Sequence, residues 1–295
     1  MSHRNIYTCP MTPNKKLHGI LQLFRPELSF ASAICVIVGE MIALKSFPSP
    51  YELIFGFLCG FFMAGSALVL NDYFDFEVDK VNMPERALPS GAVTKPEVIA
   101  LTILASFLGL GSAYALDASA LAVAVFFWIV GFLYNWKFKQ NGLFGNLMVA
   151  SSVGVTFVIG GIAVGDPWNK LVWFFALIAF LIDFGEEIAG DAMDIEGDGL
   201  RGSRSIAIVM GKQFALRLSA SIFFLVVLLG FVPIIFGWLE NRYLLMVAIA
   251  GVVVGYFAVQ LMKSETSEEG RRIMRMIYLG PLFGLLVFIV GHFFK

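Results

Sequence analysis

Long, uninterrupted runs of apolar residues dominate the chain, and short polar joints separate each run from the next. A membrane-spanning α-helix needs about 20 mostly apolar residues, and nine runs approach that length. They cover residues 25–45, 52–72, 96–115, 118–136, 143–164, 169–190, 214–237, 243–262 and 273–293. A transmembrane β-barrel would show alternating segments of about ten residues instead. The pattern therefore predicts an all-α, multi-pass membrane protein.

Composition agrees with this prediction. Of the 295 residues, 58% are hydrophobic and 15% are charged, whereas soluble proteins are about half apolar and about a quarter charged. The 21 basic and 22 acidic residues nearly cancel, so nothing in the net charge indicates a nucleic-acid partner. The start of the chain is polar and broken by Pro10 and Pro13. We expect residues 1–24 to be a cytoplasmic N-terminal segment rather than a cleaved signal, followed by one nine-helix domain over residues 25–295.

The basic residues fall unevenly on the two sides of such a nine-helix protein. Seventeen of the 21 lie in the N-terminal segment or near the joints after the second, fourth, sixth and eighth helices. The other four are Lys45, Lys170, Arg242 and Lys295. Since basic residues favour the cytoplasmic side, the N-terminus is predicted to be cytoplasmic and the C-terminus to lie on the opposite side. The long joints 71–95 and 183–204 share the cytoplasmic side and hold most of the acids, so we expect them to form a polar cap that carries the function.

These two joints contain the same spacing of aspartates. The first set is Asp72, Asp75 and Asp79, and the second set is Asp191, Asp194 and Asp198. A constant offset of 119 residues relates each aspartate of the first set to one of the second. On an α-helix, positions i, i+3 and i+7 lie within roughly 60° of one another. We therefore expect two acidic stripes, each at the cytoplasmic end of a spanning helix.

Such a stripe needs a counter-charge. Three carboxylates on one face repel one another, and the C-terminal end of a helix also disfavours anions. Mg²⁺ prefers oxygen ligands and is usually held by one or two carboxylates together with substrate phosphates. Two stripes that face each other across the bundle would hold two or three Mg²⁺ ions with a diphosphate between them. The six aspartates are the candidate metal ligands.

Other polar residues lie at the same level and are candidates for binding the diphosphate. They are Arg25, Asn71, Arg86, Tyr134, Lys137, Arg201 and Arg204. Arginine side chains offer paired donors that match phosphate oxygens, and Arg86 lies in a loop that two prolines stiffen. Glu40 lies about 22 Å from Arg25 along the first helix, at 1.5 Å per residue, and no role is predicted for it.

At these motifs the chain resembles the UbiA family of intramembrane prenyltransferases, over nearly its whole length. The matching motifs are Asn71-Asp72-x-x-Asp75-x-x-x-Asp79, Tyr134-Asn135, Gly145-Asn146 and Asp191-x-x-Asp194-x-Glu196-Gly197-Asp198. The resemblance implies two Mg²⁺ ions that grip an isoprenyl diphosphate, and a lipid-facing chamber for its tail. The stretch NDYFDFEVDK, with LPSG and MDIEGD, is most similar to the archaeal digeranylgeranylglyceryl phosphate synthase branch. That branch implies transfer of a geranylgeranyl group to geranylgeranylglyceryl phosphate in ether-lipid synthesis.

The chain also departs from that branch. It has Met83, Glu186, Gly190 and Gly199 where the branch tends to carry basic residues, and Ala87 and Ala207 where it tends to carry proline. Fewer cations near the head-group region weaken the case for a phosphorylated acceptor. The alternative within the enzyme class is an aromatic acceptor, 4-hydroxybenzoate or a naphthoate, in quinone synthesis.

The expected chemistry is ionisation of the isoprenyl diphosphate followed by attack of the acceptor. Mg²⁺ held by the aspartates would neutralise the leaving diphosphate, and Asp191 or Asp198 would take the proton of the acceptor. The alternative from another class is a cation-coupled transporter, because acids in membrane helices often mark ion pathways. Transporter sites tend to lie near the midplane of the membrane. Here both clusters lie at helix ends on one side, which favours the enzyme.

Overall fold

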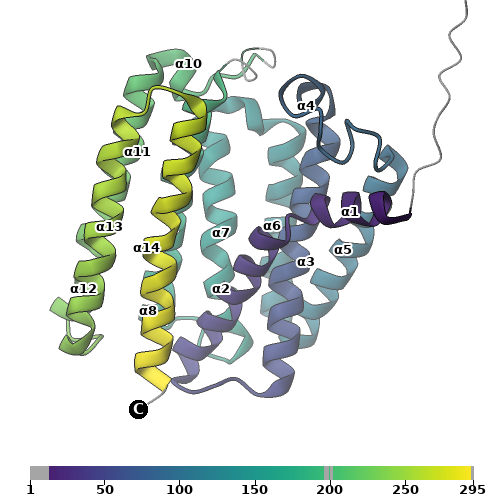
Figure 1. Ribbon diagram of the computed structural model, residues 1–295. Helices are drawn as coiled ribbons and strands as arrows, with labels where there is room; N and C mark the ends of the chain where they lie inside the picture. The colour runs from purple at the N-terminus through teal and green to yellow at the C-terminus, as the bar shows by residue number, and fades with distance from the viewer. Residues whose placement is uncertain (1–12, 196–198, 200–201, 294–295) are drawn as a thin grey trace, which may run out of the picture.

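The computed structural model describes residues 13–195, 199 and 202–293, and every regular element in those ranges is a helix. The long helices run side by side as a bundle (Figure 1). They are α2 (Pro26–Leu44), α3 (Pro50–Phe74), α5 (Lys95–Leu116), α6 (Ala118–Trp136), α7 (Leu143–Ala163), α8 (Lys170–Met193), α11 (Lys212–Leu229), α13 (Leu244–Lys263) and α14 (Ser267–Phe293). The shorter elements are α1 (Pro13–Phe24), α4 (Phe76–Asn82), α10 (Ile206–Met210), α12 (Val232–Ile235), η1 (Phe138–Asn141) and η2 (Asn241–Tyr243). The all-α prediction is confirmed for the described residues.

The predicted apolar runs coincide with the long helices to within a few residues. The one interrupted run is 214–237, where α11 ends at Leu229 and α12 begins at Val232. Pro233 stands in the first turn of α12, and a proline is tolerated there because it lacks an N–H donor. The helices therefore follow the predicted runs closely, and the one interrupted run breaks just before Pro233.

Seven stretches of the described chain are long and apolar enough to cross a membrane. They are 26–44, 50–74, 95–116, 118–136, 143–163, 212–235 and 241–263. The runs predicted at 169–190 and 273–293 fall on α8 and α14, which are also long. Both helices carry several charges, such as Glu186 in α8 and Arg271 in α14. Composition therefore supports seven spans, and the count of nine, like the cytoplasmic side of the cap, stays a prediction.

Glycines allow α2 and α7 to pack with their backbones almost in contact. A Cβ atom on Gly160 would lie 2.1 Å from the Val36 carbonyl oxygen, and one on Gly39 would lie 2.2 Å from the Phe157 carbonyl oxygen. Glu40 is fully buried in this region, and neither of its carboxylate oxygens has a hydrogen-bond partner among the described residues. Close backbone approach favours helix association in a membrane. It fixes α2, and with α2 the position of Arg25 at its start.

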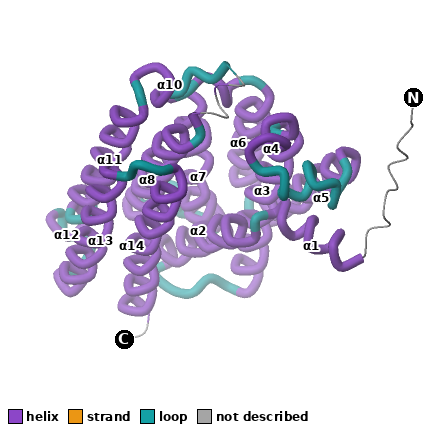
Figure 2. The backbone as a smooth tube through the Cα atoms, turned by 45° about the horizontal axis from the view of Figure 1, so that its top comes forward, coloured by secondary structure: helices purple, strands orange, loops and turns teal. Residues whose placement is uncertain are grey.

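Helix α1 lies outside the main bundle, beside α3 and α5 (Figure 2). Leu23 is fully buried in a cluster that also contains Leu88 and Val93, and Lys16 forms an ion pair with Glu97. Residues 13–24 of the N-terminal segment therefore form a helix that packs against the α4–α5 loop. This loop carries Arg86, so α1 supports one wall of the candidate site.

Candidate active site

The two aspartate sets occupy equivalent helix ends. Asp72 lies in the last turn of α3 and Asp75 is the C-cap of that helix, while Asp191 lies in the last turn of α8 and Asp194 is its C-cap. The offset of 119 residues in the sequence is therefore a structural repeat. Both helices end at the same end of the bundle, near α4 and α10 (Figure 1).

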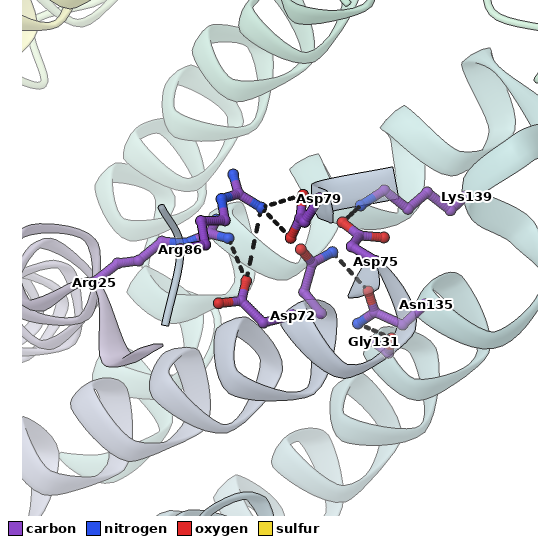
Figure 3. A network of polar contacts seen from close by, with 9 residues as sticks. Arg25, Asp72, Asp75, Asp79, Arg86, Gly131, Asn135 and Lys139 are labelled. Carbon is purple, nitrogen blue, oxygen red and sulfur yellow. Dashed lines mark hydrogen bonds and ion pairs between the residues drawn. The ribbon is translucent and has the colours of Figure 1, made fainter. Parts of the chain in front are cut away.

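The prediction that the first set forms one stripe on a continuous helix was wrong. Helix α3 ends at Phe74, and Asp79 belongs to the separate short helix α4. Asp75 joins the two helices, because its N–H donates to the Asn71 carbonyl and its own carbonyl accepts from the Asp79 N–H. Asp79 therefore does not lie on a continuation of α3. It lies above Asp72 in the view of Figure 3.

All three aspartates of the first set are nearly buried, with at most 5% of the residue exposed. Each has a cationic partner (Figure 3). Arg25 donates to Asp72 at 2.7 Å, Arg86 donates to Asp79 at 2.8 Å, and Lys139 donates to Asp75 at 2.5 Å. Burying a carboxylate is costly unless it is paired and hydrogen-bonded. The sequence therefore builds a charge-balanced network at the end of α3.

Arg86 links two of these carboxylates. Its Nη1 atom lies 2.9 and 2.8 Å from the two oxygens of Asp79 and 3.9 Å from Oδ1 of Asp72. Burial disfavours the charged guanidinium, but the negative charge and hydrogen bonds of Asp79 outweigh this effect and raise the pKa of Arg86 further. Arg86 is therefore a fixed cation, and its role as a diphosphate ligand stays a prediction.

Arg25 connects α1 to α2 in a left-handed backbone conformation, with φ 40° and ψ 72°. This conformation is costly for a residue other than glycine and persists only where the surroundings enforce it. Beside Arg25, a pocket of about 400 Å³ extends between α1 and Asp72, lined by His18, Gln22, Glu27 and Arg86 among others. The strained junction thus directs a guanidinium into a pocket that borders the aspartates.

Lys139 takes the place that the sequence analysis gave to Lys137. Lys137 is the exposed C-cap of α6, whereas the short helix η1 turns Lys139 back toward Asp75. With its amide oxygen turned toward Lys139, Asn71 accepts from Nζ at 2.8 Å and donates to Asp75 at 2.9 Å. Asn71 therefore belongs to the network, while Lys137 makes no polar contact with it among the described residues. A basic residue two positions further along was the only signal for Lys139 in the sequence.

The second set has different partners. Asn146 of α7 donates to Asp191 at 2.9 Å, and Arg271 of α14 forms an ion pair with Asp194, whose side chain is 42% exposed. Asn146 belongs to a motif that the sequence analysis noted, whereas Arg271 was not predicted. Asp198 and Arg201 lie outside the described residues.

Arg204 is exposed, and its backbone N–H donates to the Gln140 carbonyl at 2.9 Å. This bond attaches the chain after α8 to η1, the element that carries Lys139.

Tyr134 lies between the two sets. Asp75 at the end of α3 lies near its side chain, and so do Asp183, Glu187 and Asp191 of α8. The ends of α3 and α8 therefore face a common residue of α6. Asp183, Glu186 and Glu187 add carboxylates to α8 that the sequence analysis did not place in the site.

The donor set suits Mg²⁺. The described acids are all oxygen donors, and no three of the described His, Cys, Asp and Glu residues are grouped closely enough to hold an ion by themselves. Mg²⁺ typically uses one or two carboxylates and takes its other ligands from phosphates and water. Asp72 and Asp75 at the end of α3, and Asp191 and Asp194 at the end of α8, are carboxylates of this kind.

Comparison with known proteins agrees with this geometry. Residues 32–283 match the UbiA prenyltransferase family. The chain is 30% identical, over 273 residues, to digeranylgeranylglyceryl phosphate synthase of Thermococcus kodakarensis, with 92% of this chain and 97% of the relative covered. It superimposes with a TM-score of 0.75 on a solved structure of digeranylgeranylglyceryl phosphate synthase, at 29% identity, covering 95% of this chain and 100% of that one.

A more distant structural neighbour has been solved with ligands. This UbiA homologue from Archaeoglobus fulgidus is bound to GPP and Mg²⁺, with a TM-score of 0.64, 16% identity, and 92% and 100% of the two chains covered. At that identity the likeness concerns the fold alone. The family match spans most of the chain and includes both aspartate sets, and this chain is a member of the UbiA prenyltransferase family.

Proposed function

We propose that this protein transfers a geranylgeranyl group from its diphosphate to the free hydroxyl of geranylgeranylglyceryl phosphate, with two or three Mg²⁺ ions, in ether-lipid synthesis. The observation that carries the proposal is the network of three nearly buried aspartates held by Arg25, Arg86 and Lys139. The synthase from Thermococcus kodakarensis supports the choice of substrates. Membership of a prenyltransferase family favours this enzyme over a cation-coupled transporter.

The donor diphosphate would bind between the ends of α3 and α8. Asp72, Asp75, Asp191 and Asp194 would hold the Mg²⁺ ions, with Asp79 and Asp198 supporting them. The ions would supply neutralisation of the negative charge that builds on the leaving diphosphate. Arg86 and Lys139 would contact the diphosphate directly, because a guanidinium offers five N–H donors and an ammonium offers three, and the aspartates use only some of them.

Ionisation breaks the bond between the prenyl C1 atom and the diphosphate oxygen, and the electron pair leaves with the diphosphate. The allylic cation that remains needs an apolar environment with aromatic faces. Phe74 of α3 packs edge-on against Phe132 of α6 with centroids 6.2 Å apart, and Phe132 stacks on Trp128 at 6.0 Å. These rings would stabilise the cation.

The acceptor would bind in the pocket of about 400 Å³ beside Asp72. Arg25 and Arg86 line this pocket, and each hydrogen-bonds to the aspartates through a single nitrogen atom, Nη2 of Arg25 and Nη1 of Arg86. Their remaining donors would bind the phosphate of the acceptor, in place of the basic residues missing at positions 83, 186, 190 and 199. The acceptor oxygen then bonds to C1, and Asp191 or Asp198 takes its proton.

The decisive experiment is an acceptor competition with purified protein. Labelled geranylgeranyl diphosphate and Mg²⁺ are incubated with geranylgeranylglyceryl phosphate, its dephosphorylated form, 4-hydroxybenzoate and a naphthoate, and the prenylated products are identified by mass spectrometry. The phosphorylated lipid should dominate the products. Equal use of the dephosphorylated lipid would contradict the acceptor assignment. Faster turnover of an aromatic acid would favour the quinone pathway, and the transferase chemistry would stand in both cases.

A further inference from the structure

A second pocket, of about 380 Å³, lies at the end of the bundle opposite the aspartates. Three segments that are distant in the sequence form it: the end of α2, the start of α8 and the connection between α12 and α13. Its lining includes Lys45, Asn169, Lys170, Gly237, Trp238 and Leu239. None of these residues takes part in the proposed reaction.

Positive charge is scarce at this end of the protein. The charge distribution assigns only four of the 21 basic residues to this side, and the fold brings two of them, Lys45 and Lys170, to one pocket. Arg242 is neutralised by Glu240 at 3.0 Å. Neither lysine of the pocket has a carboxylate within 4 Å among the described residues. Two uncompensated ammonium groups around one cavity favour an anion.

The start of α8 adds to this preference. Lys170 is the first residue of a helix of 24 residues, and the N-terminal end of a helix carries partial positive charge. The Asn169 side chain caps this end, accepting from the N–H groups of Leu171 and Val172 at 3.0 and 3.3 Å. The amide of Asn169 also donates to the Asp166 carboxylate at 2.8 Å, so the positive charge of the pocket comes mainly from the two lysines.

The walls of the pocket indicate that the anion belongs to a lipid. Trp238 lies under the Lys170 ammonium, with Nζ 5.2 Å from the ring centroid, and it packs against Phe236, whose ring is 5.9 Å away and which is 68% exposed. Trp168, two residues before Lys170, is 80% exposed. Exposed tryptophans and phenylalanines beside lysines are typical of the membrane–water interface, which is the layer that contains lipid phosphates.

We propose that this pocket binds the anionic phosphate of a membrane lipid headgroup, with Lys45 and Lys170 as its ligands. The lipid would tie α2, α8 and the α12–α13 connection together at the far end of the bundle. Because the proposal uses no residue of the catalytic network, it stands independently of the acceptor assignment.

The test is lysine footprinting on the whole protein in detergent. An amine-acetylating reagent is applied during titration with dioctanoyl phosphatidylglycerol, dioctanoylglycerol or inorganic phosphate, and modification of each lysine is followed by mass spectrometry. Phosphatidylglycerol should slow acetylation of Lys45 and Lys170 by about tenfold at saturation, as expected for a ligand in direct contact with both amines. Dioctanoylglycerol lacks the phosphate and should not protect them.

Variants make the assignment specific. Lys170→Gln should remove the protection of Lys45, and Lys45→Gln should remove that of Lys170. The control Arg242→Gln loses the same charge at the same end of the bundle, outside the pocket, and should keep the protection. Absence of protection by phosphatidylglycerol would overturn the proposal, and so would protection of Lys45 that persists in Lys170→Gln. Equal protection by inorganic phosphate would overturn the assignment to a lipid.

Discussion

The ammonium of Lys139 lies 2.5 Å from Oδ2 of Asp75, although the two residues belong to different helical segments. Asp75 is nearly buried, and Asn71 contacts both partners. This ion pair connects the end of α3 to η1, which also holds the chain after α8 through Gln140 and Arg204. It therefore joins the two halves of the site.

Lys139→Ala should lower kcat/KM by roughly 10-fold to 100-fold, because it removes a donor to the diphosphate and leaves the Asp75 carboxylate buried without its cation. Lys137→Ala is the matched control and should stay within about twofold, since Lys137 is exposed at the end of α6. Steady-state kinetics with varied donor diphosphate measures both. Equal losses in the two variants would contradict the position of Lys139.

Asp72→Ala and Asp191→Ala should each lower turnover by about 100-fold or more, because each removes a Mg²⁺ ligand from a different half of the site. Glu77→Ala provides the comparison. Glu77 belongs to the same short helix as Asp79, but its side chain is 75% exposed and pairs only with Lys80 in the described contacts. The turnover rate is measured on variants that are shown to be folded. Substantial activity in either aspartate variant would remove that residue from the metal site.

Chelation by EDTA should abolish activity, and added Mg²⁺ should restore it, because the site offers only hard oxygen ligands. Inorganic pyrophosphate should inhibit competitively with the donor diphosphate, since it would occupy the same cations. Product formation after chelation and after Mg²⁺ addition gives the result. An enzyme that is indifferent to EDTA would be incompatible with the proposed mechanism.

Gly160→Ala should destabilise the fold by about 1–3 kcal/mol or more, because its Cβ atom would lie 2.1 Å from the Val36 carbonyl oxygen of α2. Gly111→Ala in α5 is the control, since a Cβ atom there would contact nothing within 4 Å. Thermal unfolding in detergent should show a lower midpoint for the first variant and an unchanged or higher midpoint for the second. A similar midpoint in both would mean that α2 and α7 can separate without cost.

Much of this architecture was determined locally by the sequence. The run predicted at 118–136 is α6 to the residue, and most of the other long helices differ from their predicted bounds by a few residues. The exceptions are the run 214–237, which is divided between α11 and α12, and α14, which begins at Ser267, ahead of its predicted run. The reason is that length and apolarity along one segment decide whether it forms a membrane helix. The repeat of aspartates was equally visible, because its spacing is preserved at the ends of α3 and α8.

Only the tertiary structure decided which charges meet. In the sequence, Lys137 and Lys139 are two nearby lysines that nothing distinguishes. In the structure, the turn of η1 directs Lys139 to Asp75. Nothing in the sequence indicated that Arg271 would reach Asp194, or that Lys45 and Lys170 would share a pocket. Which carboxylate a long cationic side chain contacts depends on how whole helices pack and on the turns between them. Periodicity along one segment carries no information about that packing.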